Sequence, residues 1–174
     1  MDIENAFRQS AIKKVLYYKE LGDKTLMILN DADLHFTPNE ESNSIAIIIQ
    51  HIAGNMFSRW TDFLLTDGEK TNRNRDKEFI DQELNKQQLV SIWNAGWQCF
   101  ISALKSLTGD DLLKTVYIRK EPMLVLDAIN RQMAHYPYHV GQIIYLAKII
   151  KNTDWYNLSI PKGQSQEYND QQLQ

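Results

Sequence analysis

The stretch Arg131-Gln-Met-Ala-His-Tyr-Pro-Tyr-His-Val-Gly-Gln142 contains two histidines, His135 and His139, four residues apart. On a helix this spacing stacks both rings on one face, one turn apart. The apolar residues that share this face in helical projection are Leu124, Ala128 and Leu146. The stretch therefore predicts a core-facing helix with two imidazoles in the middle of its apolar stripe.

The rest of the chain repeats this helical spacing of apolar residues. The pattern predicts helices over about 3–30, 44–65, 85–107 and from Glu121-Pro122 to about Lys151. The isoleucine run of the second segment is compatible with a strand, but its length and the cap candidate Ser44 favour a helix. Only residues 116–119 alternate like a short extended piece. We therefore expect an all-α four-helix bundle.

One domain accounts for nearly all of the sequence. The chain has 174 residues, enough for a single hydrophobic core, and we assign that domain to residues 1–163. Residues 164–174 are polar and are expected to be a disordered tail. A polar stretch from Asp67 to about Asp81 includes a short basic cluster, Lys70–Lys77, which we interpret as a solvated loop.

Composition excludes several classes of function. The net charge of −3 argues against a nucleic-acid-binding surface. No apolar run approaches the roughly 20 residues of a membrane span, and the N-terminus lacks the pattern of a signal peptide. Cys99 is the only cysteine, so no internal disulfide can form. We expect a cytoplasmic protein that acts on a small molecule.

The histidine pair becomes more informative beside His51, which lies near the apolar stripe of the second predicted helix. Alone, such a pair is more often two hydrogen-bonded core histidines than a metal site. Burying three unpaired imidazoles would cost free energy of desolvation, whereas one divalent ion satisfies all three. Neutral imidazoles suit zinc, nickel or iron, and three protein ligands leave a coordination position open. We therefore predict a metal centre on His51, His135 and His139.

Other cofactor classes do not fit the residues. Di-iron bundles use Glu-x-x-His pairs, and no histidine here follows a glutamate at that spacing. A covalent haem needs Cys-x-x-Cys-His, which a single cysteine excludes. There is no glycine-rich phosphate loop. The fourth histidine, His35, lies beside Phe36 and Pro38 and is interpreted as a partly exposed loop residue.

This pattern of one histidine on the second helix and His-x-x-x-His on the fourth resembles the DinB-like, or YfiT-like, superfamily. Segments spread over most of the chain are similar to one uncharacterised subfamily of it: Ser42-Asn-Ser-Ile45, His51-Ile-Ala-Gly-Asn55, Arg59-Trp-Thr-Asp62, Thr66-Asp-Gly-Glu-Lys70, His139-Val-Gly-Gln142 and Leu158-Ser-Ile-Pro-Lys-Gly163. The resemblance implies an up-down-down-up bundle, often a homodimer, with a divalent metal on the three histidines. Characterised relatives include S-transferases that use low-molecular-weight thiols, and others are labelled metal-dependent hydrolases.

Pro137 departs from the pattern of the superfamily, because it stands between the two ligands on the fourth helix. Proline removes one helical hydrogen bond and its ring clashes with the preceding turn. Two outcomes are open at this point, a kink that widens the site and a kink that neighbouring side chains absorb.

Three functions are compatible with such a site. The first is thiol S-transfer in stress or detoxification, in which the metal holds a thiolate that attacks an electrophile. Asn55 and Arg59, one and two turns beyond His51, are candidates for binding a substrate carboxylate, although an ion pair explains Arg59 equally well. The second is hydrolysis by a metal-bound water. The third is a non-catalytic metal-binding stress-response protein. A nearby carboxylate would favour water activation, and a channel with anion-binding groups would favour a thiol.

Overall fold

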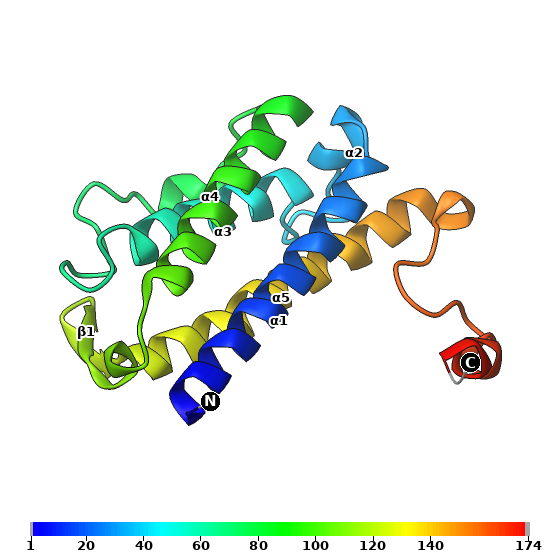
Figure 1. Ribbon diagram of the computed structural model, residues 1–174. Helices are drawn as coiled ribbons and strands as arrows, with labels where there is room; N and C mark the ends of the chain where they lie inside the picture. Colours follow the sequence, from blue (N-terminus) through cyan, green and yellow to red (C-terminus); the bar gives the residue numbers. More distant parts are fainter. Residues whose placement is uncertain (1, 173–174) are drawn as a thin grey trace.

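Four long helices form the body of the protein, for which a computed structural model describes residues 2–172. They are α1 (Ile3–Met27), α3 (Ile45–Trp60), α4 (Lys86–Ser106) and α5 (Val125–Lys151). In Figure 1, α1 and α5 lie side by side and run in the same direction, whereas α3 and α4 run the opposite way. The all-α bundle predicted from the helical spacing is confirmed, and α5 keeps the predicted C-terminal limit.

Aromatic side chains fill the centre of the bundle. Trp93, Trp97 and Phe100 of α4 are fully buried, and Phe100 packs against Trp60 of α3 with the ring centroids 4.5 Å apart. The i, i+3, i+4 spacing on α4 had predicted this apolar face. Gly22 of α1 allows the close approach of a neighbour, because a Cβ atom there would lie 2.4 Å from Cζ2 of Trp93. The close packing of Trp93 against α1 therefore requires glycine at position 22.

The chain departs from the predicted helix limits after α1 and after α3. Asn30, predicted at the end of the first helix, instead caps a separate short helix, α2 (Asp31–His35), through a reciprocal capping box with Asp33. Ser44 caps α3 as predicted, but α3 ends at Trp60 rather than near Leu65. The chain leaves the helix there because Thr61 is extended and Asp62 has a φ of 49°.

A β-hairpin replaces the first turn predicted for the last helix. β1 (Thr115–Ile118) pairs antiparallel with β2 (Glu121–Leu124), so Pro122 lies in a strand opposite Tyr117 and not in α5. The turn residues Arg119 and Lys120 both have positive φ, as a tight hairpin turn requires. The carboxylate of Asp67 accepts hydrogen bonds from both of their amides. Asp67 thus supports a turn whose residues are not the usual Asn-Gly pair.

Short helical pieces complete the chain. Three 3-10 helices, η1 (Asp76–Phe79), η2 (Asp110–Leu113) and η3 (Asn152–Asp154), lie in the connections. The tail that we expected to be disordered contains a helix, α6 (Ser165–Gln172), whose described side chains are all exposed. Its glutamines and glutamate are good helix formers, so local propensity favours a helix in part of this segment.

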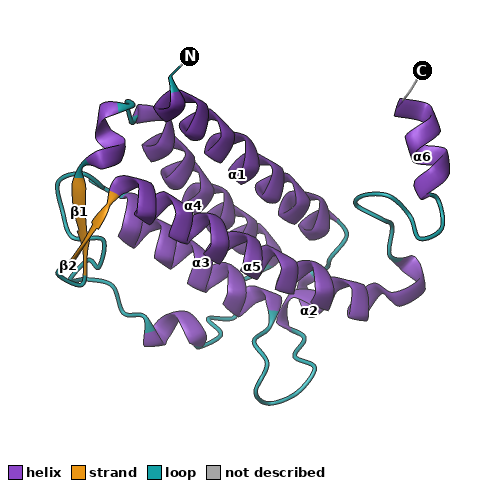
Figure 2. Ribbon diagram, turned by 90° about the horizontal axis from the view of Figure 1, so that it is seen from below, coloured by secondary structure: helices purple, strands orange, loops and turns teal. Residues whose placement is uncertain are grey.

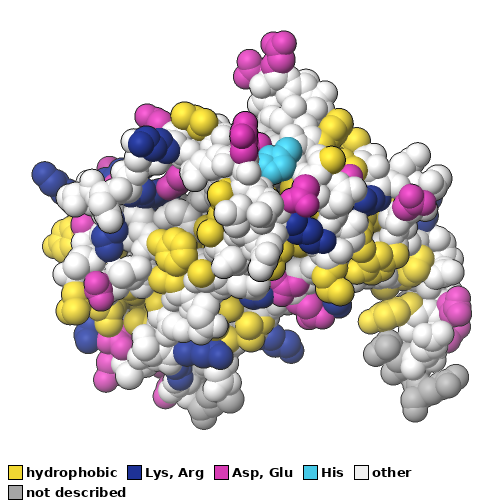
Figure 3. All heavy atoms as spheres, turned by 90° about the horizontal axis from the view of Figure 1, so that it is seen from above, with side chains coloured by type: hydrophobic (Ala, Val, Ile, Leu, Met, Phe, Trp, Pro, Cys, Tyr) yellow, Lys and Arg dark blue, Asp and Glu magenta, His cyan; other side chains and the backbone are white. Residues whose placement is uncertain are grey.

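The C-terminal arm and the hairpin lie at opposite ends of the molecule. Figure 2 shows α6 standing apart from the bundle, joined to it by an extended connection, and the space-filling view of Figure 3 shows an arm at the lower right that projects from the main body. The hairpin closes the other end, beside the start of α5 (Figure 2). Within residues 2–172, none of the helices combines the length and apolar character needed to cross a bilayer.

Candidate metal centre

Three histidines from two helices meet beside the bundle core. His51 lies on α3, and His135 and His139 lie one turn apart on α5. Each offers one ring nitrogen, and the three nitrogens lie within 4.8 Å of one another. The Nε2 atoms of His135 and His139 are 3.0 Å apart. The structure therefore brings together the three histidines that the sequence singled out.

The Nδ1 atom of each of the three rings lies beside an oxygen of a second side chain, which we call the outer partner of that histidine. The carboxylate of Glu78 lies 3.0 Å from Nδ1 of His51. On α5, Oε1 of Gln132 lies 3.3 Å from Nδ1 of His135, and Oε1 of Gln142 lies 2.7 Å from Nδ1 of His139. With Nδ1–H donating to these oxygens, each Nε2 lone pair is left for the centre. Such backing is characteristic of histidine ligands of metals.

Burial keeps the rings on α5 in their neutral, metal-binding form. Desolvation, followed by the charges of His139 and His51, lowers the pKa of His135 to about 3. Burial also lowers the pKa of His139, and its hydrogen bond to Gln142 only partly opposes this. If both rings carry their proton on Nδ1, the two Nε2 lone pairs face each other at 3.0 Å, a contact that a shared cation would relieve.

This donor set fits a divalent metal ion. For zinc at about 2.0–2.1 Å from each imidazole nitrogen, tetrahedral angles separate the nitrogens by about 3.3 Å, close to the 3.0 Å between His135 and His139. The three histidines are thus positioned to bind one ion, and three protein ligands leave a further coordination position.

Glu78 reaches His51 from the polar stretch that follows α3. Arg73 holds it with two hydrogen bonds, Nε to Oε1 at 2.7 Å and Nη2 to Oε2 at 2.8 Å. Burial opposes ionisation of Glu78, but the bonds from Arg73 and His51 outweigh it and lower the pKa of the carboxyl. The basic cluster is therefore more than the solvated loop we expected, since only 5% of the Arg73 side chain is exposed.

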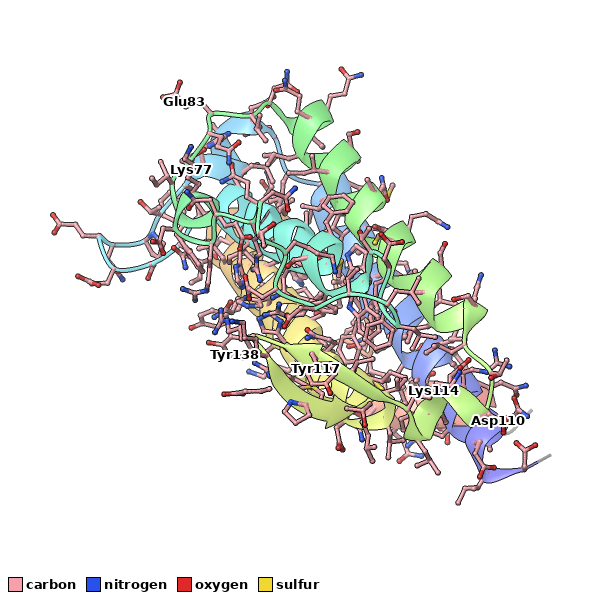
Figure 4. The ribbon with its side chains drawn as sticks, turned by 90° about the vertical axis from the view of Figure 1, so that its left-hand side faces the viewer. Lys77, Glu83, Asp110, Lys114, Tyr117 and Tyr138 are labelled. Atoms are coloured by element: carbon pink, nitrogen blue, oxygen red, sulfur yellow. The ribbon has the colours of Figure 1, made fainter. Side chains whose placement is uncertain are left out.

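A pocket of about 310 Å³ adjoins the histidines and is rich in arginine. His51, His135 and Gln132 line it together with five arginines, namely Arg59, Arg73, Arg75, Arg119 and Arg131. Figure 4 looks onto this side of the molecule, with the hairpin in front of α5 and the loop that carries Lys77 above it. The arginines come from α3, that loop, the hairpin turn and α5, so four separate segments contribute positive charge to one pocket.

Two carboxylates offset only part of this charge. Glu69 pairs with Arg59, Arg73 and Arg119, and Glu78 pairs with Arg73. Within residues 2–172, neither Arg75 nor Arg131 forms an ion pair with a carboxylate. The pocket therefore carries an excess of positive charge before any metal is counted.

Both residues that we proposed for substrate binding line this pocket. Asn55 is buried, and its Oδ1 accepts a hydrogen bond from the Tyr136 hydroxyl at 3.0 Å. Arg59 forms the ion pair with Glu69 that we had considered as the alternative, and it also donates to the carbonyl of Gly68. Its Nε is buried and has no partner in the described part of the chain.

Pro137 does not separate the two ligands of α5. The helix is continuous from Val125 to Lys151 with the proline inside it, and the rings on either side of it approach to 3.0 Å. α5 therefore continues through Pro137 in spite of the hydrogen bond that the proline removes.

Sequence reasoning missed the partners behind the histidines. Gln132 precedes His135 by three residues and Gln142 follows His139 by three, so helical spacing alone would have placed both glutamines beside the rings. Glu78 and Arg73 carried no such signal, because they come from an irregular loop. His35 lies apart from the site and is partly exposed, but it is the last residue of α2 and not the loop residue we expected; it contacts Asp81 and the carbonyl of Leu84.

Comparisons with known proteins bear on the fold and the family of this chain. No curated protein matches the chain. A crystal structure described as the conserved protein of locus from Enterococcus faecalis is similar, with a TM-score of 0.65 and 14% sequence identity over 87% of this chain and 99% of that one. At this identity the likeness shows the fold alone. The model of the family "Protein of unknown function (DUF1572)" matches residues 2–164. The chain with its three converging histidines is therefore a member of the DUF1572 family.

Proposed function

We propose that this protein is a metal-dependent thiol S-transferase of the DinB-like type, with His51, His135 and His139 as its metal ligands. The observation that carries the proposal is the arginine-rich pocket beside the histidines. Held by three neutral imidazoles, a divalent ion would keep its full charge and favour the thiolate of a bound thiol, which is the nucleophilic form. Imidazole ligands suit zinc, nickel or iron.

The surrounding residues favour a thiol that carries negative charge. Arg75 and Arg131 line the pocket without an ion-pair partner in residues 2–172. Guanidinium groups bind carboxylates in a bidentate manner, so these two arginines suit the acidic part of a small thiol whose sulfur reaches the histidines. The buried Nε of Arg59 adds a further donor at the same pocket.

In the proposed reaction the thiolate sulfur forms a bond to the electrophilic atom of the second substrate. The leaving group departs with the electron pair of the bond that breaks, and the thiol proton is released to water. No further general base is needed once the thiol has lost its proton. This suits the site, because Glu78 lies behind His51 and is occupied by two bonds from Arg73.

Hydrolysis is the second candidate, and Glu78 is the observation in its favour. It is a buried carboxylate in direct contact with a histidine of the centre. A base for water must reach the open face of the ion, however, and this carboxylate contacts the Nδ1 side of His51. A non-catalytic metal-binding role stays open for a protein that shows neither activity.

The test is a thiol-transfer assay with 1-chloro-2,4-dinitrobenzene as electrophile and metal-loaded protein. We expect turnover with acidic thiols such as glutathione or bacillithiol and much less with cysteamine, which carries no carboxylate. His51→Ala should abolish the activity. Arg131→Gln should raise the KM for the acidic thiol by about three- to tenfold, while Lys13→Gln, an exposed control on α1, should leave it unchanged. Equal rates with and without metal, or with and without thiol, would reject the proposal.

A further inference from the structure

Arg75 and Arg131 bring positive charge to the arginine-rich pocket without a carboxylate to balance it. Both line the pocket, and within residues 2–172 neither guanidinium forms an ion pair or a side-chain hydrogen bond. Glu69 and Glu78 balance two of the five arginines there, which leaves three positive charges before any histidine or metal is counted. A single carboxylate would neutralise only one of these charges.

An aromatic ring holds the guanidinium of Arg75 beside the three-histidine centre. Its Cζ atom lies 4.9 Å from the centroid of the Phe79 ring, and that ring packs against the His51 ring with the centroids 4.7 Å apart. A guanidinium that lies over a ring contacts it through its face, while its N–H groups point outward in its own plane. Arg75 therefore keeps its N–H donors for a ligand of the pocket.

A neutral donor reaches the same pocket from α3. The indole Nε1–H of Trp60 can only donate, and it bonds to the Tyr136 oxygen at 3.1 Å. The one proton of that hydroxyl therefore goes to Oδ1 of Asn55, at 3.0 Å, and fixes the side-chain amide with its Nδ2 turned away from Tyr136. Asn55 is 7% exposed, and its Nδ2 has no partner in residues 2–172, yet this atom is not fully enclosed as Nε of Arg59 is. Because Asn55 lines the pocket, its amide offers donors there.

These donors come from three separate segments, namely α3, the stretch before η1, and α5. A carboxylate offers two oxygens in one plane, whereas a phosphate monoester offers three oxygens and nearly two negative charges. The pocket volume of about 310 Å³ is larger than a phosphate group alone, so part of the molecule that carries the group also fits.

We infer that this pocket binds the phosphate group of a small phosphate monoester, with Arg75, Arg131 and Nδ2 of Asn55 as its donors. The inference rests on the proposed function only for the role of this molecule, as one of the two substrates of the transfer. Binding itself requires neither the metal nor the reaction.

The experiment compares 4-fluorophenyl phosphate with 4-fluorobenzoate by ligand-observed fluorine NMR on the full chain, freed of metal with a chelating resin. The two probes share the fluorinated ring and differ in the anionic group. The phosphate should bind at least about tenfold more tightly, because it pairs with more of the charged donors. Inorganic phosphate should displace it only at higher concentrations than phenyl phosphate does, because the free ion leaves the rest of the pocket unfilled.

Two variants test the donors against a matched control. Arg75→Gln should weaken binding of 4-fluorophenyl phosphate by about 10- to 100-fold, the usual worth of a hydrogen bond to a charged group. Asn55→Ala should weaken it by about three- to tenfold, as expected for a neutral donor. Lys77→Gln removes the same charge from an exposed residue that does not line the pocket, and it should bind as the wild type does. Arg75 is itself exposed, so Arg75→Gln decides the matter if Asn55→Ala does not fold.

Three results would overturn the inference. The first is that the phosphate probe does not bind the wild type, or binds no more tightly than the carboxylate probe. The second is equal displacement by inorganic phosphate and phenyl phosphate, and the third is equal affinity of Arg75→Gln and Lys77→Gln. No metal, thiol or electrophile is present in these measurements, so anion binding and the proposed transfer can each fail while the other stands.

Discussion

Glu78 connects His51 to Arg73. Its carboxylate contacts Nδ1 of His51 and accepts two hydrogen bonds from Arg73. A carboxylate behind a histidine ligand fixes the ring and raises its basicity. Glu78→Gln should therefore weaken binding of the metal by about 10- to 100-fold, measured by competition with a chromophoric chelator. Glu41→Gln, an exposed loop control, should bind as the wild type does. Equal affinities for all three proteins would show that the contact with His51 is incidental.

Asp111 makes the stability of the fold depend on pH. Its carboxylate accepts bonds from Lys114 and from the amide and hydroxyl of Thr108. The bond from Lys114, followed by those from Thr108, lowers its pKa from 3.8 to about 2. Because the folded pKa is the lower one, the stabilisation is complete above about pH 4 and is lost as the pH falls toward 2.

Asp111→Asn should thus lower the urea midpoint at pH 7, and the gap to the wild type should narrow as the pH falls below 4. Urea titrations at several pH values between 7 and 3 check this. A gap of constant size across that range would mean that the charge of Asp111 does not stabilise the fold.

At the scale of an element, α5 carries two ligands around an internal proline. Proline inside a helix costs roughly 3 kcal/mol through its missing amide and its clash with the preceding turn. Pro137→Ala should therefore raise the free energy of unfolding by about 1–3 kcal/mol, as measured in urea. Because His135 and His139 already converge to 3.0 Å, metal affinity should change by less than about twofold. A large gain in affinity would show that Pro137 holds the rings away from their best geometry.

At the scale of the whole molecule, an exposed apolar stripe on α5 suggests how two copies meet. Tyr138, Tyr145 and Ile149 follow helical spacing and are 62%, 70% and 47% exposed. We propose a homodimer through this stripe, with twice the chain mass of 20.3 kDa in light scattering. Tyr145→Glu should yield monomers, and Tyr117→Glu on the hairpin should remain dimeric. A monomeric wild type at micromolar concentration would contradict this proposal.

Local sequence patterns predicted the helices and the candidate ligands. The apolar faces of α3, α4 and α5, the cap at Ser44 and the three histidines all follow from local periodicity. The hairpin and the outer partner of His51 do not. Asp67 supports the turn at Arg119 and Lys120 from more than 50 positions away, and Glu78 reaches His51 from an irregular loop. Such contacts depend on where the packed helices bring distant loops, which a local pattern does not record.

Metal analysis of the purified protein tests the three-histidine centre most directly. After loading with zinc, nickel or iron in turn and removal of excess ion, wild type should retain one ion per chain for at least one of these metals. His51→Ala should retain almost none, and His35→Ala should match the wild type because His35 lies outside the centre. Equal metal content in wild type and His51→Ala would contradict the account.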